Sequence, residues 1–491
     1  MTKSRLSQRF FFGVLFSIVV FTSLSSFLSS ETRASVRLPR VFGNDMVLQR
    51  DSKTPVWGWA SPGEKVVVDI CGQRKSTVAS EQGTWRIELA PQPAGGPYEL
   101  TVRGTNTITY SNVYYGEVWI CAGQSNIVFP LKRSKSAPET AQTATYPQLR
   151  FLTVPALSAD EPQNDFSSKW EKCSPKTAPD VSAVAFYFGQ YLHEKLQVAV
   201  GIIIAARSGS TGEAWVARDE LAKFPELEPL VEPNRLNRAA PSQKAGSLFN
   251  GMIKPICPYA IRGVVWYQGE SNANRAWQYR TLFPILIANW REEWGRGDFP
   301  FIYVQLPNFM EQRDAPASSA WAELREAQHK ALSLRNVAEV VTIDVGEAQD
   351  LHPKDKKTVG VRLANAALGK FYEKNVPWTG PEFKSMIISD NKAVLTFTHA
   401  TGGLVQCENA QCDGSVLQGF AIAGSDRKFY WADARIENGD QVVVSSPDVP
   451  RPVSVRYAWA DNPACNLTNE SGLPASPFRT DDWTGVTVDA R

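Results

Sequence analysis

Histidine is scarce in this chain, with four among 491 residues, so chemistry that depends on an imidazole has few candidates. The zinc-binding spacings Cys-x-x-Cys and His-Glu-x-x-His do not occur, and we expect no metal site. The sequence has no P-loop and no strand-linked Gly-x-Gly-x-x-Gly, which argues against nucleotide chemistry. The Gly-x-Ser-x-Gly turn of α/β-hydrolases is also missing, so a serine hydrolase with this sequence would need a different turn.

An excess of either charge is absent as well. The 52 Lys and Arg residues against 50 Asp and Glu residues give a formal charge of +2, which predicts no nucleic-acid partner. Without residues 1–34 the formal charge is −1, so long-range attraction of a charged partner is not expected. Past the N-terminal segment no run of ~18 apolar residues occurs, and we expect no membrane span there.

The N-terminal segment is typical of an export signal. Three cations, Lys3, Arg5 and Arg9, precede an apolar core over residues 10–21; small residues follow, and residues 32–34 (TRA) offer a cleavage site. We therefore expect a cleaved signal peptide over residues 1–34 and a secreted or periplasmic protein. The alternative is an uncleaved anchor helix, although serines dilute the apolar stretch.

The seven cysteines cannot all be paired within one chain. Export would permit disulfides, and Cys407 and Cys412, which flank a polar loop, are the favoured pair. Cys121 lies in an apolar strand pattern, so we expect it to be a buried thiol.

Three regions with different patterns make up the rest of the chain. Residues 35–111 alternate short apolar runs with turns every ~8–12 residues, which indicates an N-terminal β-sandwich-like domain. Residues 112–383 alternate strand and helix patterns, which predicts an α/β domain built on a parallel sheet. Residues 384–491 return to short strand patterns, which predicts a C-terminal β-rich domain.

The expected elements of the α/β region follow from hydrophobic periodicity. Apolar runs predict strands over residues 117–122, 198–205, 262–267, 301–305 and 340–344. Spacings of three and four residues predict helices over residues 184–195, 279–294, 321–334 and 358–372.

Four polar loops follow expected strands of this region, at the edge where open parallel sheets bind ligands. They cover residues 123–126, 207–212, 268–272 and 350–353. Each loop alone is weak evidence for a functional site. The first two could be ordinary turns, the third could be a helix N-cap, and the fourth could be a surface histidine near a carboxylate.

The residues of these loops suit acyl transfer. Ser125, on a glycine-containing turn, could expose its hydroxyl as a nucleophile. His352 is the one histidine of the four on a loop past an α/β strand, and Asp350 could orient the imidazole of such a base. Glycine in the loop over residues 207–212 could let the backbone bare an N–H toward a ligand, and the side-chain amide of Asn272 could donate to an oxyanion.

Three sequence blocks resemble those of the sialate O-acetylesterase family within the SGNH (GDSL-like) hydrolases. They cover residues 116–126 (GEVWICAGQSN), 266–273 (WYQGESNA) and 350–353 (DLHP). The similarity extends to residues 46–50, 297–301 and 457–463, and it spans nearly the whole chain after residue 34. It implies an SGNH-type three-layer α/β/α core with a parallel sheet as the catalytic domain, flanked by the N-terminal and C-terminal β-rich parts.

The resemblance also implies a role for each residue of the site. Ser125 would be the nucleophile, His352 the base and Asp350 the orienting acid, with Asp344 as the alternative acid. The oxyanion hole would use the N–H groups of Ser125 and Gly209 and the side chain of Asn272. The family's second block usually contains Gly-Gly-Thr, whereas this chain has Ser-Gly-Ser at residues 208–210.

Other polar residues near these loops are candidates for substrate binding. We expect Gln124, Gln268 and Glu270 to contact the substrate. An arginine would match the carboxylate of a sialic acid, and the candidates are Arg207, Arg275 and Arg280. No metal or organic cofactor is required.

Together, the residues and the resemblance predict a secreted carbohydrate O-acetylesterase, similar to sialate 9-O-acetylesterases, that acts on an acetylated carbohydrate. The alternatives are an acetylxylan or other polysaccharide acetylesterase, an acetyltransferase with the same acyl-enzyme, and a non-catalytic carbohydrate-binding protein. The oligomeric state stays open.

Overall fold

A computed structural model of the chain describes residues 35–408 and 414–490. The signal peptide expected over residues 1–34 lies outside this part of the chain, and so does Cys412, so export and the disulfide with Cys407 stay predictions. No helix within the described ranges is both long and apolar enough to cross a bilayer.

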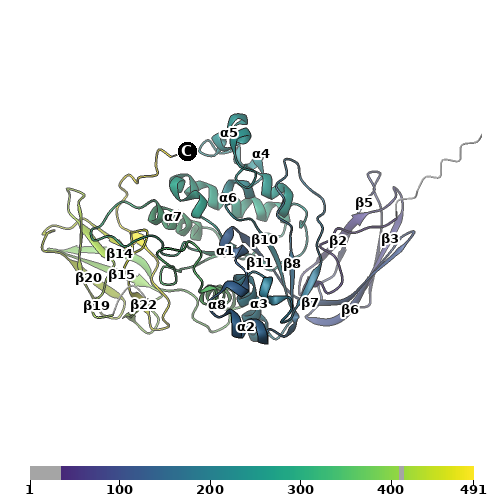
Figure 1. The fold of residues 1–491 in the computed structure, drawn as a ribbon, viewed down its shortest axis with the longest axis horizontal. Helices are drawn as coiled ribbons and strands as arrows, with labels where there is room; N and C mark the ends of the chain where they lie inside the picture. The colour runs from purple at the N-terminus through teal and green to yellow at the C-terminus, as the bar shows by residue number, and fades with distance from the viewer. Residues whose placement is uncertain (1–34, 409–413, 491) are drawn as a thin grey trace, which may run out of the picture. The chain divides into compact units, whose positions relative to one another are not determined.

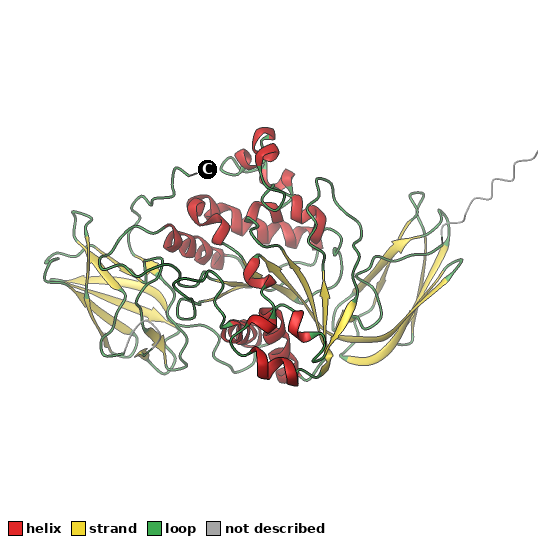
Figure 2. Ribbon diagram, in the orientation of Figure 1, coloured by secondary structure: helices red, strands yellow, loops and turns green. Residues whose placement is uncertain are grey.

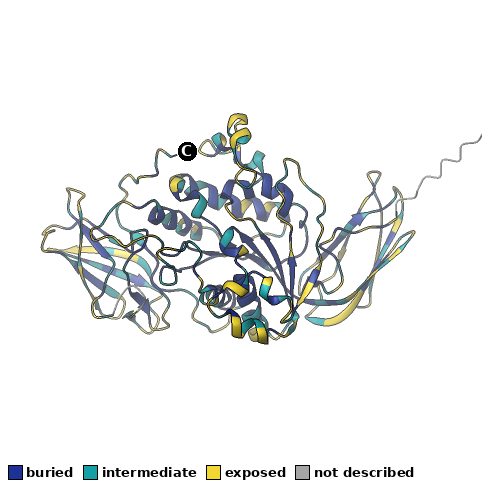
Figure 3. Cartoon of the chain, viewed as in Figure 1, coloured by how far each residue is buried: buried dark blue, intermediate teal, exposed yellow. Residues whose placement is uncertain are grey.

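A parallel sheet forms the centre of the fold (Figure 1). Its strands are β7 (Thr107–Gly123), β8 (Tyr146–Thr153), β10 (Val200–Ala206), β11 (Gly263–Tyr267), β12 (Phe301–Val304) and β13 (Val337–Val340), with β9 (Trp170–Cys173) antiparallel at one edge. They lie in the order β13-β12-β11-β7-β10-β8-β9. The strands of this sheet are largely buried (Figure 3), because both faces are covered.

Helices cover the two faces of this sheet (Figures 1 and 2). The helices α3 (Ala183–Leu196) and α8 (Lys356–Ala366) pack on one face, and α6 (Ala276–Trp294) and α7 (Ala320–His329) pack on the other. Successive strand residues point to opposite faces, so the neighbours Trp119 and Ile120 belong to different apolar clusters. The expected three-layer α/β/α core is confirmed, and Cys121 is a buried thiol within it, as expected.

Four short helices lie in the connections between these elements. They are α1 (Ser125–Val128), α2 (Ala137–Thr143), α4 (Arg218–Leu221) and α5 (Pro233–Arg238). The first of them begins directly after the end of β7.

The N-terminal strands join the central sheet through one long strand. They are β1 (Val47–Gln49), β2 (Thr54–Trp59), β3 (Lys65–Ile70), β4 (Gln73–Val78), β5 (Thr84–Leu89) and β6 (Gly95–Arg103). The first half of β7 pairs with β6, and its second half pairs with β10 and β11. The domain boundary predicted between residues 111 and 112 therefore falls inside a continuous strand.

The C-terminal region is β-rich, as expected. Its strands are β14 (Glu382–Ser389), β15 (Lys392–Thr398), β16 (Leu404–Gln406), β17 (Phe420–Ala423), β18 (Phe429–Trp431), β19 (Asp433–Glu437), β20 (Gln441–Ser445), β21 (Ser454–Tyr457), β22 (Leu467–Asn469) and β23 (Phe478–Arg479). The order β14-β15-β20-β19 forms one sheet and β18-β17-β21-β23 another, and they enclose a separate apolar core.

The last strand of the central sheet differs from its prediction. A strand was expected over residues 340–344, but β13 ends at Val340. The reason is that Ile343 packs into the apolar core of the C-terminal region, so the apolar run serves two cores in turn. Asp344 consequently lies in the connection after β13 and not at the end of the strand.

Candidate active site

The strand order creates a crevice at the carboxyl edge of the sheet. After β7 the chain forms β8, β9 and β10 on one side of β7, and it then crosses to β11 on the other side. Ligands bind open α/β sheets at such a switch point, outside the carboxyl ends of the strands. A cleft of about 570 Å³ lies there, and all four predicted polar loops contribute to its lining: Gln124 and Ser125, Ser208 and Gly209, Glu270 and Ser271, and Leu351 and His352.

The turn that carries Ser125 depends on a close contact between β7 and β11. Gly123 has φ of +138°, and a Cβ atom at this residue would stand 2.1 Å from the carbonyl oxygen of Tyr267. The next residue, Gln124, donates its N–H to the same carbonyl at 3.0 Å. Only glycine fits at this position, and the chain then turns at once into α1, whose first residue is the half-buried Ser125.

His352 also lines the cleft and has a carboxylate beside it. Its Nδ1 is 3.6 Å from Oδ1 of Asp350, and the same oxygen accepts the N–H of His352 at 2.8 Å. The alternative acid, Asp344, instead accepts two hydrogen bonds of 2.6 Å from the guanidinium of Arg362. The geometry therefore favours Asp350 over Asp344 as the partner of the imidazole.

Asn272 is buried, and its amide is held in one orientation. Its Oδ1 accepts hydrogen bonds from the N–H of Gly212 at 2.8 Å and from Nε2 of Gln268 at 2.7 Å. Its Nδ2 donates one hydrogen to Glu213 at 2.9 Å, and an amide nitrogen carries a second. The second hydrogen on Nδ2 of Asn272 is therefore the group that could still donate, for example to an oxyanion.

Gln268 is placed differently from the other predicted substrate-binding residues. It is fully buried and absent from the lining of the cleft, whereas Gln124 and Glu270 belong to that lining. Its Nε2 is bonded to Ser210 and Asn272, and its Oε1 accepts the hydroxyl of Tyr279 at 2.9 Å. These contacts suit a residue that fixes Asn272 rather than one that touches substrate.

A buried polar network beneath the cleft was not foreseen from the sequence. Nδ2 of Asn126 donates to Glu270 at 2.6 Å and to the carbonyl of Leu351 at 3.2 Å. The ammonium group of Lys356, which is fully buried, donates to Oδ1 of Asn126. Asn126 thus ties together the loops that carry Ser125, Glu270 and His352.

Burial shifts the pKa values of the two ionisable groups in this network. Burial lowers the pKa of Lys356 from 10.5 to about 7, although the carboxylate of Glu270 opposes the change. Burial also raises the pKa of Glu270, against the hydrogen bond from Asn126 and the charge of Lys356. The Lys356 ammonium lies 5.0 Å from the ring centre of Phe129 and 5.5 Å from that of Tyr267, which stabilises its charged form.

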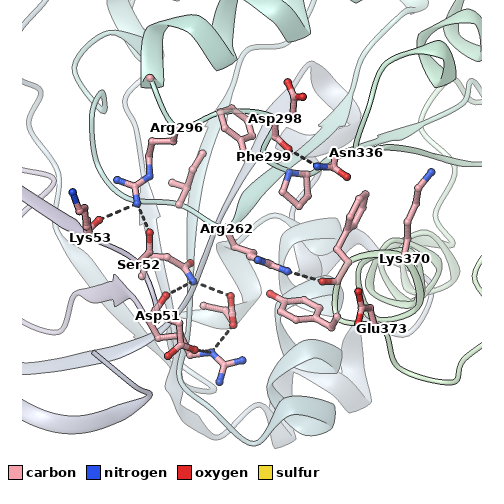
Figure 4. Close-up of a pocket in the computed structure, with 18 of the residues that line it drawn as sticks. Asp51, Ser52, Lys53, Arg262, Arg296, Asp298, Phe299, Asn336, Lys370 and Glu373 are labelled. Atoms are coloured by element: carbon pink, nitrogen blue, oxygen red, sulfur yellow. Dashed lines mark hydrogen bonds and ion pairs between the residues drawn. The ribbon is translucent and has the colours of Figure 1, made fainter. Parts of the chain in front are cut away.

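A larger cavity, of about 880 Å³, lies at the other edge of the central sheet (Figure 4). Arg262, Asp298 and Asn336 in its lining precede β11, β12 and β13, so it opens at the amino ends of the strands. Its cations have partners: Arg262 donates to a main-chain carbonyl at 2.5 Å, and Arg296 donates to another at 2.9 Å. No histidine lines it, so it lacks the imidazole base expected beside the nucleophile.

An α/β/α fold with a cleft at the carboxyl ends of its strands agrees with the class of carboxylic ester hydrolases. Residues 115–369 match the family described as carbohydrate esterase, sialic acid-specific acetylesterase. The chain belongs to this family, as the sequence blocks predicted.

Relatives of known function are similar over nearly their whole length. The sialate O-acetylesterase of Mus musculus is 29% identical, with 95% of this chain and 97% of the relative covered. The sialate O-acetylesterase of Homo sapiens is also 29% identical, over 90% of this chain and 92% of the relative. A crystal structure of a carbohydrate acetylesterase from Xanthomonas citri is 37% identical and superposes with a TM-score of 0.84, covering 91% of this chain and 100% of that one.

Proposed function

We propose that this carbohydrate acetylesterase cleaves O-acetyl groups from sugars through an acyl-enzyme formed on Ser125. Its family supports the acetylesterase activity. One observation carries the mechanism: four loops that are far apart in sequence line one cleft, and Ser125 and His352 both belong to its lining.

In the first half of the reaction, the Ser125 hydroxyl attacks the acetyl carbonyl while His352 accepts the hydroxyl proton. The carbonyl oxygen becomes an oxyanion, which the N–H groups of Ser125 and Gly209 and the amide of Asn272 would stabilise. The intermediate then breaks its bond to the sugar oxygen, which takes the proton from His352 and leaves as an alcohol.

In the second half, water replaces the sugar alcohol. His352 removes a proton from this water, whose oxygen attacks the acetyl-enzyme and forms a second oxyanion. Collapse of this intermediate releases acetate and returns the proton to Ser125. Asp350 would stabilise the imidazolium formed in each half.

The cleft favours an acidic sugar as the substrate. The three arginines suggested by the sequence do not line it, and Arg275 is bonded to Glu213 at 2.6 Å. Arg133 does line it, is exposed, and has its guanidinium 4.9 Å from the ring centre of Phe129. A guanidinium at this place would match the carboxylate of an O-acetylated sialic acid. Acetylxylan is the alternative, and acetate release from the two substrates distinguishes them.

Export belongs to this proposal too, because residues 1–34 have the pattern of a cleaved signal. The expected location is secreted or periplasmic. N-terminal sequencing of protein recovered outside the cytoplasm tests it, and a mature chain that still begins at Met1 would contradict it.

The nucleophile is tested by acetate release from purified wild type and Ser125→Ala protein. We expect the variant to lose activity by on the order of 10³-fold or more, because the acyl-enzyme cannot form. Ser271→Ala is the matched control, since Ser271 also lines the cleft. Equal rates for wild type and Ser125→Ala would refute the assignment.

A further inference from the structure

A cavity of about 370 Å³, separate from the catalytic cleft, is lined by four aromatic side chains. They are Phe429 and Trp431 of β18, Trp459 just after β21, and Trp483 near the C-terminus. This cavity, here called the aromatic pocket, shares no lining residue with the cleft that contains Ser125. The reaction derived above does not use it.

The rings of the aromatic pocket are fixed before any ligand binds. Trp431, 43% exposed, donates its Nε1 to the carbonyl of Asp314 at 2.8 Å. The Arg456 guanidinium lies 4.1 Å from the ring centre of Phe429 and 5.1 Å from that of Trp459. Two hydrogen bonds of 2.8 Å to a buried carboxylate, that of residue 481, hold this guanidinium in place. A ligand would therefore meet preformed ring faces, which keeps the entropic cost of binding low.

The lining offers polar groups as well as ring faces. The exposed guanidinium of Arg427 lies 5.5 Å from the ring centre of Trp483, and Ser318 and Thr484 also line the pocket. A pyranose ring has the matching chemistry, because it presents C–H groups on its faces and hydroxyl groups around its edge. A sugar can form hydrogen bonds with these polar groups through its hydroxyls, which a purely apolar ligand cannot do.

One connection takes part in both cavities. Between β12 and α7 the chain contributes Phe309 to the catalytic cleft and residues 316–318 to the aromatic pocket, and Trp321 at the start of α7 returns to the cleft. The same short segment therefore lines both cavities. This continuity suits a glycan with several sugar units better than a single acetylated monosaccharide.

We propose that the aromatic pocket is a second carbohydrate-binding site, which holds a non-reacting sugar unit of the glycan that is deacetylated at Ser125. This inference takes its class of ligand, a carbohydrate, from the proposed function. It goes beyond that function by adding a binding site outside the cleft. Its ligand is a pyranose stacked on the tryptophan rings, with Arg427 available for an acidic substituent.

Binding is measured in a Ser125→Ala background, so that no turnover interferes. The probes are soluble xylan and sialyllactose, titrated calorimetrically into full-length protein. Trp431→Ala and Trp483→Ala should each weaken binding of at least one probe by about tenfold or more, as truncation of a central aromatic contact does. Trp277→Ala is the matched control, because Trp277 is 37% exposed on α6, outside both cavities, and its variant should bind as the parent does.

The two probes distinguish the nature of the sugar. If Arg427→Ala weakens sialyllactose alone, an acidic sugar occupies the pocket, and if it changes neither probe while the tryptophan variants weaken xylan, a neutral one does. Arg427 is exposed and Trp431→Phe keeps a ring, so these variants serve if an alanine variant unfolds. Unchanged affinity in folded tryptophan variants, or a parent that binds neither probe, overturns the proposal.

Kinetics separate this proposal from the proposed function. With Ser125 intact, Trp431→Ala should hydrolyse a small acetyl ester at the wild-type rate and show a raised KM on acetylated polymer. Loss of small-ester hydrolysis in Ser125→Ala tests the catalytic assignment by itself, whatever the aromatic pocket binds.

Discussion

At the scale of single residues, His352 can accept a proton only while its imidazole is neutral. Burial lowers the pKa of His352 below its ordinary value, and the charges of Lys356 and Arg133 lower it further, while Asp350 opposes them. The base should therefore stay neutral to lower pH than an ordinary histidine, and the acidic limb of kcat/KM should shift in the same direction.

Lys356 gives a test of this electrostatic balance. Removing its charge in Lys356→Met takes away a cation that disfavours the imidazolium, so the pKa of His352 should rise. The acidic limb of kcat/KM for a small acetyl ester should then move to higher pH. Lys357→Met is the control, because Lys357 is exposed one residue further along α8. Identical pH profiles for the two variants would contradict the expected role of Lys356.

The two candidate acids can be separated by paired substitutions. Asp350→Asn should lower kcat by on the order of 10²–10⁴, because the imidazolium loses its carboxylate partner. Asp344→Asn should leave kcat near that of the wild type, since Asp344 is bonded to Arg362, although the melting temperature should fall. A larger loss of kcat in Asp344→Asn would reverse the assignment.

The loops of the site were predictable and the network beneath them was not. Ser125, Gly209, Glu270 and His352 each follow an apolar strand pattern, and strand ends of a parallel sheet meet at one edge. Lys356 stands in a run of lysines and an aspartate that is typical of an exposed helix start. Its ammonium lies over the rings of Phe129 and Tyr267, which are distant in sequence, and such long-range contacts leave no local pattern.

At the scale of elements, the contact between the ends of β7 and β11 positions the nucleophile turn. Gly269, which follows β11, also has a positive φ, of +156°, and a Cβ there would stand 2.7 Å from Leu324 of α7. Both glycines thus sit where two elements approach closely. The turn that carries Ser125 is set by this packing as much as by its own sequence.

Gly123→Ala tests the importance of that contact. The new methyl group would collide with the Tyr267 carbonyl and push the two strand ends apart, so both the melting temperature and kcat should fall. Gly63→Ala is a matched control, since Gly63 has φ of +76° with open space around its Cβ position. It should cost only the backbone strain, ~1–2 kcal/mol, without loss of kcat. Equal effects of the two substitutions would contradict a role for the close contact.

Periodicity predicted which elements exist better than it predicted where they end. The helix expected over residues 279–294 is present as α6, which begins three residues earlier. The strand expected over residues 340–344 was misplaced because Val341 and Ile343 pack with a different core. An apolar residue in the sequence indicates burial, but it does not indicate in which of several cores the residue is buried.

At the scale of the whole molecule, the N-terminal strands share an apolar core with the α/β region. The ring centres of Phe42 and Tyr259 are 5.4 Å apart, and the hydroxyl of Tyr259 donates to the carbonyl of Val47 at 2.7 Å. Trp170 of β9 donates to the carbonyl of Val41 at 2.8 Å. The N-terminal region is therefore part of the same folded unit as the cleft.

Deleting residues 35–106 tests this dependence. The deletion removes β1–β6 and would expose the apolar surface around Tyr259, so we expect insoluble or inactive protein. Solubility, far-UV circular dichroism and acetate release measure the outcome. A soluble fragment with wild-type activity would show that the α/β region folds alone.

The passage of β7 through two sheets has a consequence for how such enzymes can be recombined. No hinge separates the N-terminal sheet from the nucleophile, because hydrogen bonds to β6 give way directly to those with β10 and β11 along the same strand. The N-terminal sheet therefore helps to hold the end of β7, and with it Ser125, in place. A chimera that exchanged it with that of a relative would have to splice inside residues 107–123 and restore both ladders in register, or the serine would be displaced.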